Sequence, residues 1–201
     1  MAKASWVKVT PSQGSGDATV NVSSTAEHTG RVARTSTLTW KAANVADIQR
    51  TVNQAGKPEY VDVADAASAD KAGKVVTISG RSNSAKLTFS LGTGDLTEIS
   101  LPNTYTANSV STQNGAAIAG DPGAASEYTF SISITVPANE TINAKTRQII
   151  VEDGAGHRDV CTLTSAAGDA YVTIAEGDIE LDYLGTAVAV EVKSNTTWSI
   201  E

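Results

Sequence analysis

Cysteine, histidine and aromatic side chains are scarce in this chain of 201 residues, and their scarcity excludes several kinds of site. The lone cysteine, Cys161, excludes an intrachain disulfide and a cysteine-rich metal site. The two histidines, His28 and His157, stand at no recognisable spacing from a nucleophile. Phe, Trp and Tyr together make up only 5% of the residues, so aromatic binding platforms are few.

Basic charge and long apolar runs are also lacking. Fifteen Lys and Arg face 22 Asp and Glu, for a formal net charge of -7, and phosphate binding needs clustered basic residues. We therefore expect no nucleic-acid partner. No segment approaches the ~18 apolar residues of a membrane span, and no apolar stretch follows Lys3 as in a signal peptide. A protein made and left in a cytoplasm, or packaged into a particle there, is expected, unless the chain is a piece of a secreted protein.

Short segments that alternate apolar or β-branched residues with small polar ones are what the sequence does contain. This is the pattern of half-buried strands, and turn-forming residues separate the segments. The clearest segments are Ala18–Val22, Thr35–Trp40, Val75–Ile78, Lys86–Leu91, Tyr128–Val136 and Ala187–Val192. For the best helix candidate, Val63–Ala72, we favour an irregular strand or loop, because its apolar residues are mostly alanines. An all-β fold of β-sandwiches is predicted.

An internal repeat organises the chain. One copy consists of Tyr60–Asp65, Gly73–Ile78 and Arg81–Asn83, and the other of Tyr171–Glu176, Gly185–Val190 and Lys193–Asn195. Glycine and asparagine are 10 residues apart in both copies, and the asparagines are 112 residues apart. A second block, from Arg34 to Gln54, parallels Arg147 to Ala166, and the surroundings of Trp6 match those of Trp198.

The repeat divides the chain into one complete unit and two halves. Residues 60–170 form the complete unit, 5–59 the back half of a unit and 171–201 a front half. A half sandwich alone exposes strand edges and an apolar face. We therefore expect 171–201 to complete 5–59, either within one chain or between chains by strand exchange into rings or filaments. The alternative is that the chain is cut from a longer one.

The complete unit carries an insertion of about 34 residues relative to the first half, at about 92–126. Loops of this length in compact domains are usually functional or disordered. We predict either a binding loop or subunit contact, with Asn103, Tyr105 and Asp121 as interaction residues, or a mobile excursion. Leu96–Leu101 is expected to form a short extra hairpin strand.

Residues suited to chemistry are few, and we expect no catalytic residue, cofactor or metal site. His157 lies in a glycine-rich stretch that is typical of a hairpin turn, and Cys161 alternates with apolar neighbours like a small buried hydrophobe. The acidic clusters lack the loop spacing and glycine of a calcium site. Trp6 and Trp198 are expected in the core, whereas Trp40 ends a strand and is a candidate for interaction with a partner or a sugar.

Several segments together resemble one family. They are Trp6–Asp17, Val52–Gly56, Val136–Thr141 with Arg147, and Gly185 with Ser194–Trp198. They look like the BACON domain, an immunoglobulin-like sandwich common in gut Bacteroidetes proteins, and cover most of the chain except about 92–126. The resemblance implies immunoglobulin-like sandwiches. Family members sit beside glycan-degrading enzymes and surface lipoproteins, and occur in structural proteins of tailed phages. Secreted members normally follow a signal segment, and Met1 starts almost directly on a strand, which favours a virion protein.

The expected function is therefore that of a non-enzymatic virion structural protein, a capsid-decorating or fibre-associated subunit. Its expected partners are other virion proteins and itself, as a homo-oligomer formed by strand complementation in a virion assembled in the bacterial host cytoplasm. The alternative is a carbohydrate- or mucin-binding module on a bacterial cell surface, with host or mucosal glycans as partners. No nucleic acid and no membrane are expected in either case.

Overall fold

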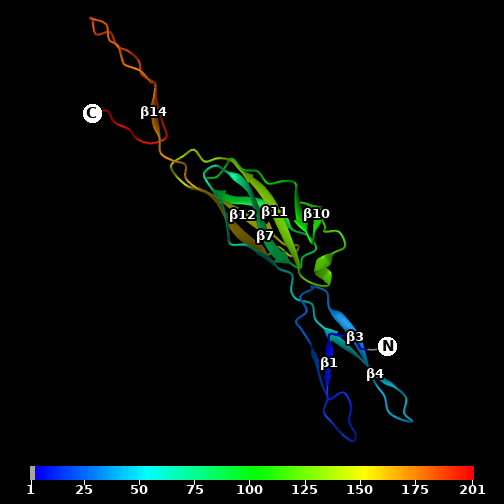
Figure 1. The fold of residues 1–201 in the computed structure, drawn as a ribbon. Coiled ribbons are helices and arrows are strands. Elements are labelled where there is room, and N and C mark those ends of the chain that lie inside the picture. The colour runs from blue at the N-terminus through cyan, green and yellow to red at the C-terminus, as the bar shows by residue number, and fades with distance from the viewer. Residues whose placement is uncertain (1–2) are drawn as a thin grey trace.

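The computed structural model describes residues 3–201 and shows an elongated molecule with three parts in a row (Figure 1). A sandwich of two sheets, residues 60–170, lies in the middle. The N-terminal segment 5–59 lies at one end and the C-terminal segment 171–201 at the other. The described residues hold one short 3-10 helix and no α-helix. The all-β sandwich fold expected from the sequence is confirmed.

Two sheets form the central sandwich. The first has the order β10-β9-β11-β7-β5 and consists of β5 (Val61–Val63), β7 (Lys74–Ser82), β9 (Thr104–Ala107), β10 (Val110–Gln113) and β11 (Tyr128–Val136). The second has the order β6-β13-β12-β8 and consists of β6 (Ala66–Ala69), β8 (Thr88–Gly94), β12 (Lys145–Glu152) and β13 (Arg158–Ser165). β6 runs parallel to β13, and the other neighbours are antiparallel. This distribution of strands between two sheets is immunoglobulin-like.

The core lies between the two sheets and follows from the period of two. Along β11, Ile132 and Ile134 are buried while Ser133 and Thr135 are exposed. Phe89 packs its ring against the rings of Tyr105 and Phe130, with centroids 4.8 and 5.8 Å apart. One contiguous cluster of buried apolar residues results, which is what an independently folded sandwich needs.

Residues 5–59 form two separate hairpins. β1 (Val7–Thr10) pairs with β2 (Asn21–Ser24), and β3 (Arg34–Trp40) pairs with β4 (Ile48–Gln54). Seven residue pairs join β3 to β4, and each has the register of a β12–β13 pair 111 residues later. Arg34 therefore corresponds to Lys145 and not to Arg147, which corrects the alignment expected from the sequence.

Residues 171–201 form a thin ribbon beyond the other end of the sandwich (Figure 1). Only β14 (Val172–Ile174) and β15 (Val192–Ser194) pair, with the same register as β5 and β7. The strand expected over Ala187–Val192 is thus absent except for its last residue. Completion of 5–59 by 171–201 within one chain needs the two segments side by side, whereas this structure places them at opposite ends.

The secondary structure of the insertion differs from the one that the sequence predicts. Leu96–Leu101 is not a strand, and the added hairpin is β9–β10 instead, followed by the 3-10 helix η1 (Pro122–Ala124). The hairpin turns at Asn108 and Ser109, both with positive φ, and such a turn carries no glycine to reveal it. The stretch Val63–Ala72 contains β6, so the strand favoured there over a helix is confirmed.

Candidate interaction surfaces

Two of the predicted interaction residues lie in the insertion around β9. Tyr105 is 3% exposed in the core, where its hydroxyl accepts a hydrogen bond from the Leu87 backbone N–H (3.2 Å). Burial raises the pKa of this phenol. The prediction that Tyr105 lies on a binding loop is wrong, because the alternation of β9 turns its side chain inward. Asn103 is exposed, and its carbonyl accepts a hydrogen bond from the Asn114 N–H (2.9 Å).

Asp121, a third predicted interaction residue, fastens the N-terminal segment to the sandwich. Both of its carboxylate oxygens accept hydrogen bonds from the Arg31 guanidinium, one of them at 2.6 Å. The bonds from Arg31 hold the pKa of Asp121 below its usual value, and the same pair raises the pKa of Arg31. Arg31 also donates to the Asn83 carbonyl (3.2 Å). The Asp121 carboxylate is thus engaged within the chain.

The backbone of η1 completes this contact. The Arg31 N–H donates to the Gly123 carbonyl (2.9 Å), and the Val32 N–H donates to the Ala124 carbonyl (3.1 Å). A Cβ at Gly123 would lie 2.0 Å from the Asn83 carbonyl oxygen, so only glycine permits the approach. One role of the insertion is therefore internal, because it clamps the preceding unit.

Asn83 lies at the centre of the junction between 5–59 and the sandwich. Its side chain is fully buried, and its Oδ1 accepts a hydrogen bond from the Tyr60 N–H (3.0 Å). Its Nδ2 lies 3.2 Å from the carbonyl oxygens of Thr29, Lys57 and Pro58. One amide thus ties a loop of the first half, the linker and the first residue of the sandwich together.

The second junction repeats the first. Asn195 Oδ1 accepts from the Tyr171 N–H (3.0 Å), and its Nδ2 donates to the carbonyls of Glu140 (2.7 Å) and Asp169 (2.8 Å). The serine before each asparagine donates its hydroxyl hydrogen to the carbonyl of the tyrosine, at 2.7 Å in the first junction and 2.8 Å in the second. Residues 171–195 therefore begin a unit joined to the sandwich as the sandwich is joined to 5–59. The sequence showed the repeated Ser-Asn pair, but not the carbonyls it holds.

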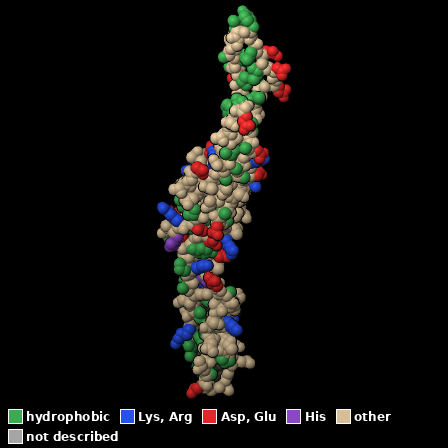
Figure 2. Space-filling model, turned by 90° about the vertical axis from the view of Figure 1, so that its left-hand side faces the viewer, with side chains coloured by type: hydrophobic (Ala, Val, Ile, Leu, Met, Phe, Trp, Pro, Cys, Tyr) green, Lys and Arg blue, Asp and Glu red, His purple; other side chains and the backbone are tan. Residues whose placement is uncertain are grey.

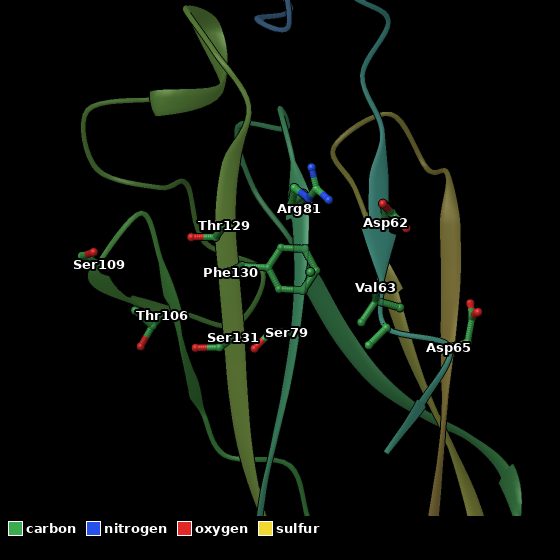
Figure 3. A pocket seen from close by; sticks show the side chains of 12 residues that line it. Asp62, Val63, Asp65, Ser79, Arg81, Thr106, Ser109, Thr129, Phe130 and Ser131 are labelled. Carbon is green, nitrogen blue, oxygen red and sulfur yellow. The ribbon is translucent and has the colours of Figure 1, made fainter.

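A broad depression of about 730 Å³ lies over the exposed face of the five-stranded sheet (Figure 3). Charged side chains are present at its margin, where Arg81 lies 3.7 Å from Glu127. The ring of Phe130 belongs to the core and is buried. The exposed side chains that line the sheet are mostly hydroxyls, from Ser79, Thr106, Ser109, Thr129 and Ser131. This lining offers hydrogen bonds but no exposed aromatic ring for stacking on a sugar.

A second hollow, of about 640 Å³, lies in the N-terminal half between its two hairpins. Its lining combines apolar side chains such as Val9, Leu38 and Trp40 with polar ones such as Lys3, Gln13 and Lys41. Trp40 is 41% exposed here, yet its counterpart in the sandwich, Val151, is fully buried. The hollow thus corresponds to the core of the sandwich left open on one side.

The C-terminal segment exposes apolar side chains along its whole length, as the green patches at the top of Figure 2 show. Eleven exposed large hydrophobic residues belong to it and five to 5–59, but only three to the complete unit. Carboxylates gather along one side of the same ribbon (Figure 2). Folded monomeric proteins rarely expose large apolar patches.

The thiol of Cys161 and the imidazole of His157 lie in surroundings that are typical of structural side chains. The Cys161 thiol is buried, which raises its pKa to about 11 and leaves little thiolate at neutral pH. His157 lies in the β12–β13 turn with Nδ1 2.8 Å from the buried Asp153 carboxylate, which also accepts backbone N–H groups of the turn. Within residues 3–201, no three His, Cys, Asp or Glu side chains gather as metal ligands do. No helix in that range has the length and hydrophobicity to cross a membrane.

No known family model matches the chain, and no curated protein matches it. Among solved structures, it is similar to a Bacteroides thetaiotaomicron protein determined by NMR, with 13% identity over 56% of this chain and 89% of that one, and a TM-score of 0.28. It is also similar to the cadherin-like domains 1 to 4 of zebrafish RET, with 12% identity over 69% of this chain and 34% of that one, and a TM-score of 0.33. No family is identified, and the BACON resemblance stays a prediction.

Proposed function

We propose that this protein is a non-enzymatic structural subunit that acts by protein–protein assembly. The observation that carries the proposal is that segments 5–59 and 171–201, on either side of a complete sandwich (Figure 1), hold strands paired on one edge only and exposed apolar side chains. Each half leaves strand edges without partners and apolar side chains in water. Such edges are templates for another chain, and such surface favours association.

Light scattering coupled to size-exclusion chromatography tests the assembly function. Species well above the 20.7 kDa of one chain are expected, with a mass that rises with protein concentration. A folded species that stays at the mass of one chain over the whole concentration range, with and without candidate partner proteins, would contradict the proposal.

The particle we propose for this subunit is a virion, in which it decorates the capsid or associates with a fibre. The support is the resemblance of its segments to immunoglobulin-like units that occur in structural proteins of tailed phages. Mass spectrometry of purified particles should detect peptides from all three parts of the chain. Their absence from purified particles, with the protein present in the lysate, would argue for assembly elsewhere.

The second candidate function is glycan binding, which the half-exposed Trp40 ring in the N-terminal hollow favours. Indole rings stack on sugars, but Trp40 occupies a position that is core in the complete unit, which supports assembly instead. A glycan array with the native chain and with Trp40→Ala separates the two. Binding that is lost in Trp40→Ala supports a glycan site, and no signal above background removes it.

A further inference from the structure

We infer that the partner of each terminal half is a second copy of this chain: residues 171–195 of one copy insert as strands into the half-sandwich 5–59 of the next. The inference rests on the proposed assembly function and names its partner. It follows from which strands each half holds, from the free edges and side chains at the two ends, and from their charges.

The two halves hold complementary sets of strands. In the complete unit, β5, β6 and β7 precede Asn83, and β8, β11, β12 and β13 follow it. Residues 5–59 supply four strands, β1–β4, in the order of the later group, and 171–195 supply β14 and β15 in place of β5 and β7. Residues 178–181, unpaired here, stand at the repeat position of β6. Together the halves contain the segment that corresponds to each strand of a sandwich once, apart from the insertion.

The free edges of the halves are the ones that the missing strands occupy in the sandwich. β13 is covered on its outer edge by β6, whereas β4 pairs only with β3. β7 lies between β5 and β11, whereas β15 pairs only with β14. β1 and β2 pair with each other, although β8 and β11 lie in opposite sheets. Insertion therefore replaces the β1–β2 ladder by pairing of β2 with 186–194, as β11 pairs with β7.

The turn at Gly185 has the same geometry as the turn at Gly73, which packs against the end of the neighbouring strand β11. The Gly185 N–H donates to the Asp182 carbonyl, as the Gly73 N–H does to Asp70, both at 3.0 Å, with φ of 69° and 74°. A Cβ at Gly73 would lie 2.5 Å from the backbone of Pro137, at the end of β11. At Gly185, no atom of residues 3–201 lies within 4 Å of the same point. The same turn is present in both copies, and in the second its neighbour is missing.

Apolar side chains on the ribbon match buried ones in the sandwich. Val188 and Val190 stand where the complete unit has Val76 and Ile78, and all four belong to one inward-facing row of the repeat. The first pair is exposed and the second is buried.

On the acceptor side, Leu38 and Trp40 line the hollow that would receive Val188 and Val190. They stand at the repeat positions of Ile149 and Val151, which are buried on β12. Arg50 is the exception, since it stands where the sandwich has Cys161.

The charges of the halves are of opposite sign. Residues 1–59 contain seven Lys and Arg and four Asp and Glu, which gives +3. Residues 171–201 contain one Lys and six Asp and Glu, which gives -5. Complementary charge steers the two surfaces together and fixes which surfaces meet. A second copy supplies this complement at each end of every chain.

The repeat also fixes the register of the contact. In the sandwich β6 and β13 pair in parallel, with Ser68 beside Thr164. The offsets of 112 and 111 residues place Glu180 of one copy beside Asn53 of the next, both with exposed side chains. Because the two joined surfaces differ, the contact is head to tail and builds an open filament or a closed ring. Each added copy contributes two complete sandwiches to the row.

Disulfide trapping in the chain of 201 residues tests this register. We expect Asn53→Cys/Glu180→Cys to give a ladder of covalent multimers under mild oxidation that collapses on reduction. Neighbouring strands lie ~4.7–4.9 Å apart, which is within the ~4.4–6.8 Å between Cα atoms that a disulfide spans. The control is Asn53→Cys/Tyr183→Cys, whose second cysteine replaces a side chain that is 96% exposed but out of register. Loss of the ladder is expected there. Mass spectrometry of a mixture of isotopically light and heavy chains shows that the bond joins two copies.

Aspartate substitutions at matched valines give an independent test. Val190→Asp should shift the protein from multimers to single chains and leave the melting of the sandwich unchanged, because Val190 contacts only the next copy. Val75→Asp, on the exposed face of β7, should leave the multimers intact.

Three outcomes separate the inference from the proposed function. Multimers joined at residues 53 and 180 and dissolved by Val190→Asp support it. Multimers without the in-register disulfide overturn it and leave the assembly function standing. Single chains at every concentration, with no disulfide between copies, overturn the inference, while detection of the protein in purified particles decides the assembly function separately.

Discussion

The complete unit and the terminal halves share one strand pattern and differ in what surrounds it. Ile78 on β7 is 1% exposed, whereas Val190, at the same position of the repeat, is 38% exposed. Both follow a glycine turn and precede a Ser-Asn pair that anchors the unit to its neighbour. An alternating sequence therefore favours a strand, but the apolar face of that strand is buried only where other strands lie beside it.

The largest difference between the two regions is expected in the core. Ile78→Ala should lower the free energy of unfolding of the sandwich by about 2–5 kcal/mol, because it removes fully buried methylene groups and leaves a cavity. Val190→Ala should change it by less than about 0.5 kcal/mol under conditions where the chain is monomeric. Urea unfolding of both variants measures this. Equal losses would mean that the ribbon folds as part of the sandwich.

The second largest difference is expected between the two junction asparagines, Asn83 and Asn195, in the stability lost when each is replaced. Asn83→Ala removes a fully buried amide and leaves its partly buried carbonyl and N–H partners unpaired, so we expect a loss of about 1–3 kcal/mol in the unfolding of the sandwich with its N-terminal half. Asn195→Ala should cost less, because the matching groups around it are exposed to water. Thermal unfolding with limited proteolysis of each junction compares them, and a larger effect of Asn195→Ala would contradict the account.

A smaller difference is expected between the two turn glycines, Gly73 and Gly185, when each is replaced by alanine. Both have positive φ, so alanine at either position carries a backbone strain of about 1–2 kcal/mol. Gly73→Ala also brings its Cβ against the Pro137 backbone, whereas Gly185→Ala meets open space in the single chain. Gly73→Ala should therefore be the more destabilising, by chemical denaturation of monomeric protein. In multimers Gly185→Ala should weaken association, and unchanged association would argue against a strand beside that turn.

The smallest effect is expected at the clamp between Arg31 and Asp121. Because the pair lowers the pKa of Asp121, its stabilising contribution is present above the unfolded-state pKa of ~3.9 and disappears as the pH falls through the folded value. Asp121→Asn should cost about 0–1 kcal/mol at pH 7, since the pair is partly exposed. The difference from the native chain should shrink as the pH falls below the unfolded-state pKa and through the lower folded pKa of Asp121. A difference that does not change with pH would assign it to something other than the charge of Asp121.

Alternation in the sequence predicts several of the strands whose partners lie inside the chain, but not the hairpin β9–β10. Tyr128–Val136 was expected from alternation alone and is β11 with those bounds, because neighbours on both sides bury its apolar face. Ala187–Val192 alternates as clearly, yet only its last residue pairs, because no strand lies beside it. The repeat predicts which segments of the two copies are equivalent, but it does not predict that 5–59 and 171–201 lie at opposite ends of the molecule (Figure 1).

The candidate site was predicted less well than the fold. Tyr105 was placed on a loop because its surroundings are rich in Gly, Asn and Thr, and the hairpin that buries it turns at two non-glycine residues. Asp121 is predicted as an interaction residue of the insertion, and its carboxylate instead binds Arg31 of the same chain, 90 residues away. Single side chains that join distant loops leave no periodic signal in a sequence.

Hydrogen exchange of the chain of 201 residues tests most directly whether the halves complete each other. Amides of 186–191 and of β4 are compared between concentrated and dilute protein, with β7 and β13 as internal references. Protection of both segments that appears on concentration and approaches that of β7 is the result this account predicts. Fast exchange of 186–191 at every concentration, in a sample whose mass shows multimers, would contradict it.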